Sequence, residues 1–172
     1  MRKTLVTFVL IIICFIFQSS VFSYFSFGGI VPNLLIIITA STAMMRGEKA
    51  GLFTGFFAGL LADIFFGDFI CIYAIIYMYE GYICGFFHRV FFPDNYILPL
   101  ALISISDFIS GFIYYILMFL LRARFDMGHY MTHVIIPELI YTSVVAVFVY
   151  PIILFVNTKM DMIVSKGARK FV

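Results

Sequence analysis

Charged residues are scarce in this chain, and tryptophan is absent. Asp, Glu, Lys and Arg make up 12% of the 172 residues, whereas soluble domains carry about 25%. So few charges cannot cover the surface of a soluble protein, and 64% of the residues are hydrophobic. The shortage excludes an ordinary soluble domain and indicates an integral membrane protein. Without tryptophan, tyrosine must supply the aromatic side chains at the membrane boundaries.

Cysteine is rare, and the sequence motifs of common enzymes are missing. Cys14, Cys71 and Cys84 are odd in number and lie in apolar stretches, which excludes a disulfide framework, and no CxxC or Cys/His cluster is found. The chain has no HExxH, no GxSxG and no phosphate-binding glycine loop. His129 and His133 lie four residues apart but lack an accompanying acid. We therefore expect no enzymatic activity, no metal site and no cofactor.

Apolar segments divide residues 1–172 into six expected membrane spans, which together form one integral membrane domain. A span needs about 20 apolar residues at 1.5 Å each. We place the spans at about 5–21, 32–45, 50–66, 69–87, 96–121 and 134–157. The second and third spans are short and share a tight turn, so a re-entrant hairpin is the alternative. We favour two spans because they keep Arg46 and Lys49 in water. The sequence thus predicts an all-α polytopic fold, a six-helix bundle.

Lysine and arginine are distributed unevenly between the two ends of these spans. If the N-terminus is inside, the inner side holds Arg2, Lys3, Arg46, Lys49, Arg89, Lys159, Lys166, Arg169 and Lys170. The outer side holds only Arg122 and Arg124. Because cytoplasmic loops carry the excess of these residues, we expect both termini in the cytoplasm. The start of the chain is similar to a secretion signal, but no Ala-x-Ala site follows, so we expect an uncleaved first helix.

Glycines recur at helical spacing from just before the third expected span into the fourth. The six that share this spacing are Gly47, Gly51, Gly55, Gly59, Gly81 and Gly85. Small residues four apart let the backbones of two membrane helices approach closely, which lipid alone does not drive. We therefore expect these glycines to line helix-packing surfaces. Asp63 continues the same face, and a carboxylate at that position belongs against protein or water and not against lipid.

Four acids fall inside the expected spans and are predicted to line an intramembrane polar cavity. They are Asp63, Glu80, Asp107 and Glu138. Each has small or polar side chains three or four residues away, which share its helix face. No lysine or arginine lies within a span, so we expect Glu80 and Asp107 to be at least partly protonated. Two interpretations remain: a cavity for a ligand, a proton path or a partner's cationic group, or internal hydrogen bonds that fix the bundle.

One stretch of the chain resembles a known family. Its residues are Pro32-Asn33-Leu34-Leu35, Arg46-Gly47, Ala50-Gly51, Gly55, Gly59-Leu60 and Asp63. They resemble the rod shape-determining MreD family of the bacterial inner membrane, as do the chain's length and span count. The resemblance implies a non-enzymatic component of the cell-elongation complex. Its implied partners are membrane lipid, MreC and, through MreC, the MreB filament and the cell-wall synthases, with no nucleic acid.

The resemblance also implies a fold similar to the substrate-binding subunits of energy-coupling-factor vitamin transporters. A vitamin-binding transporter subunit is therefore the alternative function. Those subunits share an Ala-x-x-x-Ala surface on their first helix, whereas residues 4–22 here contain neither alanine nor glycine. A third hypothesis is a proton-coupled carrier that uses Glu80 and Asp107, but no inverted repeat is evident. We favour the shape-complex component.

Overall fold

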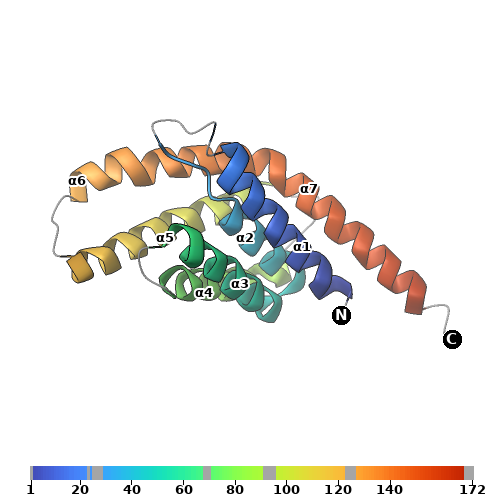
Figure 1. Cartoon of the computed structure of the whole chain (residues 1–172). Coiled ribbons are helices and arrows are strands. Elements are labelled where there is room, and N and C mark those ends of the chain that lie inside the picture. Colours follow the sequence, from blue (N-terminus) through green and yellow to red (C-terminus); the bar gives the residue numbers. More distant parts are fainter. Residues whose placement is uncertain are drawn as a thin grey trace.

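The computed structural model describes residues 2–22, 24, 29–67, 71–90, 96–122 and 127–168, and these are helical almost throughout (Figure 1). The α-helices are α1 (Arg2–Ile16), α2 (Leu34–Arg46), α3 (Glu48–Phe66), α4 (Ile72–Phe86), α5 (Ile97–Arg122), α6 (Met127–Tyr130) and α7 (Ile136–Ala168). Three tighter or wider helical segments extend them: η1 (Phe17–Phe22), η2 (Phe87–Val90) and η3 (Met131–Ile135). Arg124, Arg169 and Lys170, whose sides of the membrane are predicted above, lie outside the described residues.

Four of the described helical stretches are long and apolar enough to cross a membrane. They cover Lys3–Phe22, Glu48–Phe66, Ile97–Leu117 and Met131–Ile163. Their lipid-facing sides carry exposed isoleucine, valine and phenylalanine side chains, an arrangement that water would not favour. The chain is therefore a helical integral membrane protein, as its composition predicts.

Helix α2 lies at the centre of the bundle. Every residue from Leu34 to Met44 is buried, and α2 contacts α1, α3, α4, α5 and α7 (Figure 1). Its 13 residues extend about 20 Å, which is shorter than the roughly 30 Å hydrocarbon core. A helix this short and this apolar on all sides is covered by protein and not by lipid.

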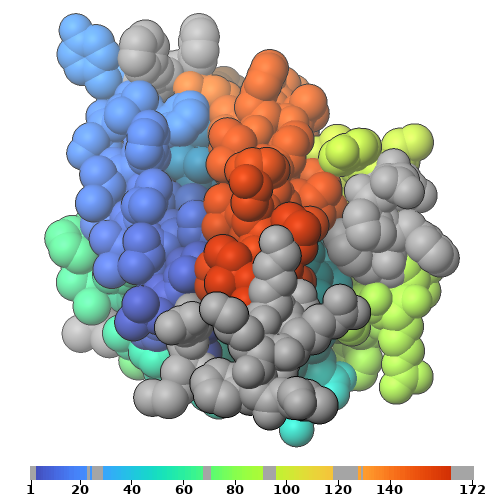
Figure 2. All heavy atoms as spheres, turned by 90° about the vertical axis from the view of Figure 1, so that its right-hand side faces the viewer, coloured from blue at the N-terminus to red at the C-terminus, as the bar shows by residue number. Residues whose placement is uncertain are grey.

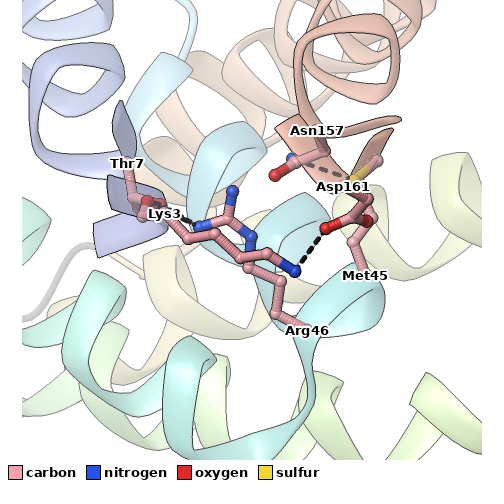
Figure 3. Close-up of polar contacts among 6 residues, drawn as sticks. All are labelled: Lys3, Thr7, Met45, Arg46, Asn157 and Asp161. Atoms are coloured by element: carbon pink, nitrogen blue, oxygen red, sulfur yellow. Dashed lines mark hydrogen bonds and ion pairs between the residues drawn. The ribbon is translucent and has the colours of Figure 1, made fainter. Parts of the chain in front are cut away.

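The start of α1 and the end of α7 lie at the same end of the bundle (Figure 1). Figure 2 faces this end and shows α1 beside α7. Here the Nζ atom of Lys3 lies 2.5 Å from Oδ1 of Asp161 (Figure 3). Arg46, the last residue of α2, donates through Nη1 to the carbonyl oxygen of Lys3 at 3.0 Å and to the hydroxyl of Thr7. Polar contacts therefore join α1, α2 and α7 at what we call the terminal end of the bundle.

The helices differ from the expected spans mainly at their ends. α2 begins at Leu34 and not at residue 32, because Asn33 caps it. α4 begins at Ile72, three residues later than expected. α7 continues to Ala168, although a short basic tail was expected from Lys159. No proline or glycine lies between Pro151 and Gly167 to end the helix earlier.

Candidate functional site

Glycines bring α3 and α4 into backbone contact. A Cβ atom built on Gly51 would overlap the carbonyl oxygen of Gly81, and one built on Gly81 would overlap that of Gly51. A Cβ on Gly55 or Gly59 would overlap the carbonyl oxygen of Tyr77 or Tyr73, respectively. No side chain larger than hydrogen fits at these positions unless the helices move apart. We call this contact the α3–α4 seam.

The α3–α4 seam ends at the terminal end of the bundle, near two further glycines of the predicted series, Gly85 and Gly47. A Cβ on Gly85 would overlap the backbone of Glu48. Gly47 differs from the others, because its own Cβ would meet only the ring of His88 at 3.8 Å. Gly47 forms the turn between α2 and α3 with a φ of 89°, a conformation that favours glycine. The structure thus places Gly47 in a turn and not on a helix-packing face.

Asp63 differs from the other three predicted cavity acids in its hydrogen bonds to backbone N–H groups. Its carboxyl oxygens accept hydrogen bonds from the backbone N–H groups of Tyr73 and Ala74, each at 2.8 Å. These two residues belong to the first turn of α4, whose N–H groups have no partner within their own helix. A buried carboxylate at a helix N-terminus is also favoured by the helix dipole. Asp63 therefore caps α4 from α3, a role that the sequence analysis did not predict.

The remaining acids come together inside the bundle from three helices. Glu80 of α4 and Asp107 of α5 are buried, and Glu138 of α7 is partly buried. Asp107 interacts electrostatically with both of the others. Among the described residues, the two carboxyl oxygens of Glu80 and Oδ1 of Asp107 have no hydrogen-bond partner, and none of the three acids forms an ion pair. We call this group the acid cluster.

Asn33 joins the start of α2 to α4 and α7 and was not identified as a site residue from the sequence. Its backbone N–H donates to Oγ1 of Thr142 at 3.0 Å, and its Nδ2 donates to the hydroxyl of Tyr77 at 2.7 Å. Its Oδ1 accepts from the backbone N–H of Ile36 at 3.3 Å. The available signal was an asparagine directly before an apolar helix, which is an N-cap pattern. A helix that starts inside a membrane bundle needs such partners.

A hollow of about 220 Å³ opens at the end of the bundle opposite the terminal end. Its polar lining includes Gln18, Asn33, Tyr73, Tyr77 and Glu138. Gln18 also accepts a hydrogen bond from the backbone of α2 at 3.2 Å. The hollow is smaller than the roughly 300 to 1,000 Å³ of most small-molecule sites. Hydrogen bonding within the protein occupies much of its polar lining.

In the part of the chain that the structure describes, no group of three or more His, Cys, Asp or Glu side chains is placed to hold a metal ion. The arrangement has two physical consequences. The seam fixes the relative position of two helices, and the acid cluster supplies hydrogen-bonding groups within an otherwise apolar interior.

Comparison with known proteins gives one clear result. The family described as rod shape-determining protein MreD matches residues 1–159 of the chain. No curated protein and no solved structure gives a significant match. The family match covers every helix of the bundle described above except the last turns of α7, and it confirms the resemblance inferred from the residues between Pro32 and Asp63. The chain belongs to the rod shape-determining MreD family.

Proposed function

We propose that the chain is a non-enzymatic scaffold of the bacterial cell-elongation complex, where it organises MreC, the MreB filament and the peptidoglycan synthases. Membership of the MreD family supports a role in determining rod shape. The observation that carries the scaffolding mechanism is the α3–α4 seam. Two backbones in contact cannot slide or separate by small side-chain adjustments, so the bundle offers its partners a surface of fixed shape.

We further propose that residues 1–172 form one domain of the bacterial inner membrane, with six spans and both termini in the cytoplasm. The terminal end of the bundle carries Lys3, Arg46, Lys49, Arg89 and Lys159. An excess of lysine and arginine at one end is typical of the cytoplasmic side. The central position of α2 supports a crossing that is completed by the non-helical residues 31–33 before it and by the protein around it.

The first turns of α7 form the proposed binding surface for the single membrane helix of MreC. An apolar hollow of about 410 Å³ lies there, lined by Ile30, Pro137, Ile140, Tyr141 and Val144. Ile140 and Val144 are more than half exposed, at 58% and 53%. In a bilayer, a neighbouring helix that fills such a hollow gains van der Waals contact that mobile lipid chains supply less well.

Crosslinking and affinity purification from membranes test this function. A photoreactive amino acid at Val144 is expected to capture MreC, whereas the same amino acid at Ile75, an exposed position on α4 (51%), is the matched control and is expected to capture lipid only. In the same experiment Gly59→Ala should reduce recovery of MreC and the synthases, while Gly111→Ala should not, because a Cβ at Gly111 meets only Ile135 at 3.5 Å or more. Absence of MreC from the wild-type purification would contradict the proposal.

A vitamin-binding transporter subunit remains the alternative function. The polar hollow near Glu138 is the one observation in its favour, and the hollow's small volume weighs against it. The same purification separates the two functions. Recovery of an ATPase-linked transport module in place of MreC would support the transporter.

A further inference from the structure

A third hollow lies between α1, α2 and α3 at the terminal end of the bundle. Its volume is about 400 Å³, and its lining includes Thr7, Ile11, Arg46, Lys49, Phe53 and Phe57. It is separate from the acid cluster and from the apolar hollow on α7, so neither the proposed scaffold nor its partner helix accounts for it.

Polarity changes along this hollow in one direction. Arg46 ends α2 and Lys49 lies in the first turn of α3, so both cations are at the end of the bundle. Ile11 and Phe57 lie about 10 to 12 Å farther along α1 and α3, counted from Thr4 and Lys49 at 1.5 Å per residue. The hollow is therefore cationic at the membrane boundary and apolar toward the membrane interior.

The cations at the boundary are not fully paired. The Nη1 atom of Arg46 donates to Lys3 and Thr7, as Figure 3 shows. Its Nη2 atom is buried and has no hydrogen-bond partner among the described residues. A buried guanidinium nitrogen without an acceptor is costly, so Arg46, which lines the hollow, keeps hydrogen-bonding capacity that no group in the described part of the protein uses.

Nearby acids do not neutralise this site. Asp161 acts electrostatically on Arg46, but its carboxylate is 59% exposed and already pairs with the ammonium of Lys3 at 2.5 Å. Glu48 lines a different hollow, on the α4 side of the bundle. Within the described residues, Lys49 forms no ion pair. The hollow therefore carries positive charge that is not neutralised by these residues of the protein and that can bind an anion.

The apolar wall is open to lipid on its outer side. Phe53 is 62% exposed and Phe8 is 39% exposed. The rings of Phe8 and Phe57 pack with their centroids 4.5 Å apart and form the surface between α1 and α3. A hydrocarbon chain can reach this wall from the bilayer without crossing water.

We propose that this hollow binds one anionic phospholipid. The phosphate lies against Arg46 and Lys49, and an acyl chain lies along Phe8, Phe53 and Phe57. Basic pockets between membrane helices at the cytoplasmic boundary bind anionic lipid headgroups in this way. A lipid held there would join α1 to the α2–α3 turn, next to the contacts that already tie α1 to α2 and α7.

Native mass spectrometry of the delipidated full chain tests the proposal, with phosphatidylglycerol and phosphatidylcholine of identical acyl chains as probes. We expect the wild type to retain phosphatidylglycerol in preference to phosphatidylcholine. Lys49→Gln should reduce this preference about fivefold, since each cation near a headgroup contributes such a factor. Lys159→Gln is the matched control and should leave the preference unchanged, because Lys159 stacks on Phe155 outside the hollow.

A second variant, Ala50→Leu, and a second probe, inorganic phosphate, complete the test. Ala50→Leu fills the hollow without changing any charge, so it should lower retention of phosphatidylglycerol in a protein that still folds. Arg46→Gln is a less specific variant, because it also removes the hydrogen bonds to Lys3 and Thr7. The test therefore depends on Lys49→Gln and Ala50→Leu. Equal retention of the two lipids by the wild type would overturn the proposal, as would equal retention by Lys49→Gln and Lys159→Gln. If the wild type retains inorganic phosphate as well as it retains phosphatidylglycerol, the hollow is a site for a free anion, and this result would also overturn the proposal.

Discussion

At the scale of single residues, the buried carboxyl groups differ in their hydrogen-bond partners. Asp63 accepts two backbone hydrogen bonds at 2.8 Å. Both carboxyl oxygens of Glu80 lack a partner among the described residues, and Asp107 is its acidic neighbour. An unpaired charge at membrane depth costs several kcal/mol. We therefore expect Glu80 and Asp107 to hold protons, and the bundle to need them only as neutral groups.

The double variant Glu80→Gln, Asp107→Asn tests this expectation, because the amides keep the shape of neutral carboxyl groups. We expect its free energy of unfolding to change by less than about 1 kcal/mol, which is a few degrees in unfolding temperature. A thiol-reactive dye can report unfolding, since Cys14 and Cys84 are buried, with Cys71→Ser removing the exposed thiol. In a strain that lacks its own copy, the variant should restore rod shape. A stable variant that fails to restore rod shape would instead assign the acids a functional role.

At the scale of helices, side-chain oxygens accept hydrogen bonds from the first turns of α2 and α4. α2 starts at Leu34, and the side chains of Gln18 and Asn33 accept hydrogen bonds from the backbone N–H groups of Leu35 and Ile36. α4 starts at Ile72 with Asp63 of α3 accepting the next two. In lipid no water replaces these acceptors. The caps therefore determine where each helix begins and also tie it to its neighbour.

Asp63→Ala is expected to destabilise the protein strongly, because it leaves the N–H groups of Tyr73 and Ala74 without acceptors. We expect a loss of about 2 to 6 kcal/mol in the free energy of unfolding, at about 1 to 3 kcal/mol for each of the two N–H groups. Asp161→Ala is the control; it removes an exposed carboxylate that pairs with Lys3 and should cost less than about 1 kcal/mol. Dye-monitored unfolding compares the two variants directly. Equal losses would show that Asp63 does not act as a cap.

At the scale of the whole molecule, the glycine series was the most predictive part of the sequence. Its period of four within an apolar segment has few explanations other than close packing, and Gly51, Gly55 and Gly59 lie against the backbone of α4. The capping role of Asp63 was not predictable, because it depends on which helix lies beside α3. The burial of α2 on all sides was not predictable either, since an apolar 13-residue segment is compatible with lipid or protein around it.

The seam between α3 and α4 is the central claim, and the unfolding temperature of Gly55→Ala beside that of Gly111→Ala tests it most directly. A methyl group at Gly55 would overlap the carbonyl oxygen of Tyr77, whereas one at Gly111 makes ordinary contact with Ile135. Overpacking of this kind costs about 1 to 3 kcal/mol, or roughly 3 to 10 °C for a chain of this size. We predict that Gly55→Ala unfolds at a temperature lower by that amount and that Gly111→Ala unfolds no lower than the wild type. Equal unfolding temperatures for the two variants would mean that α3 and α4 do not meet at Gly55.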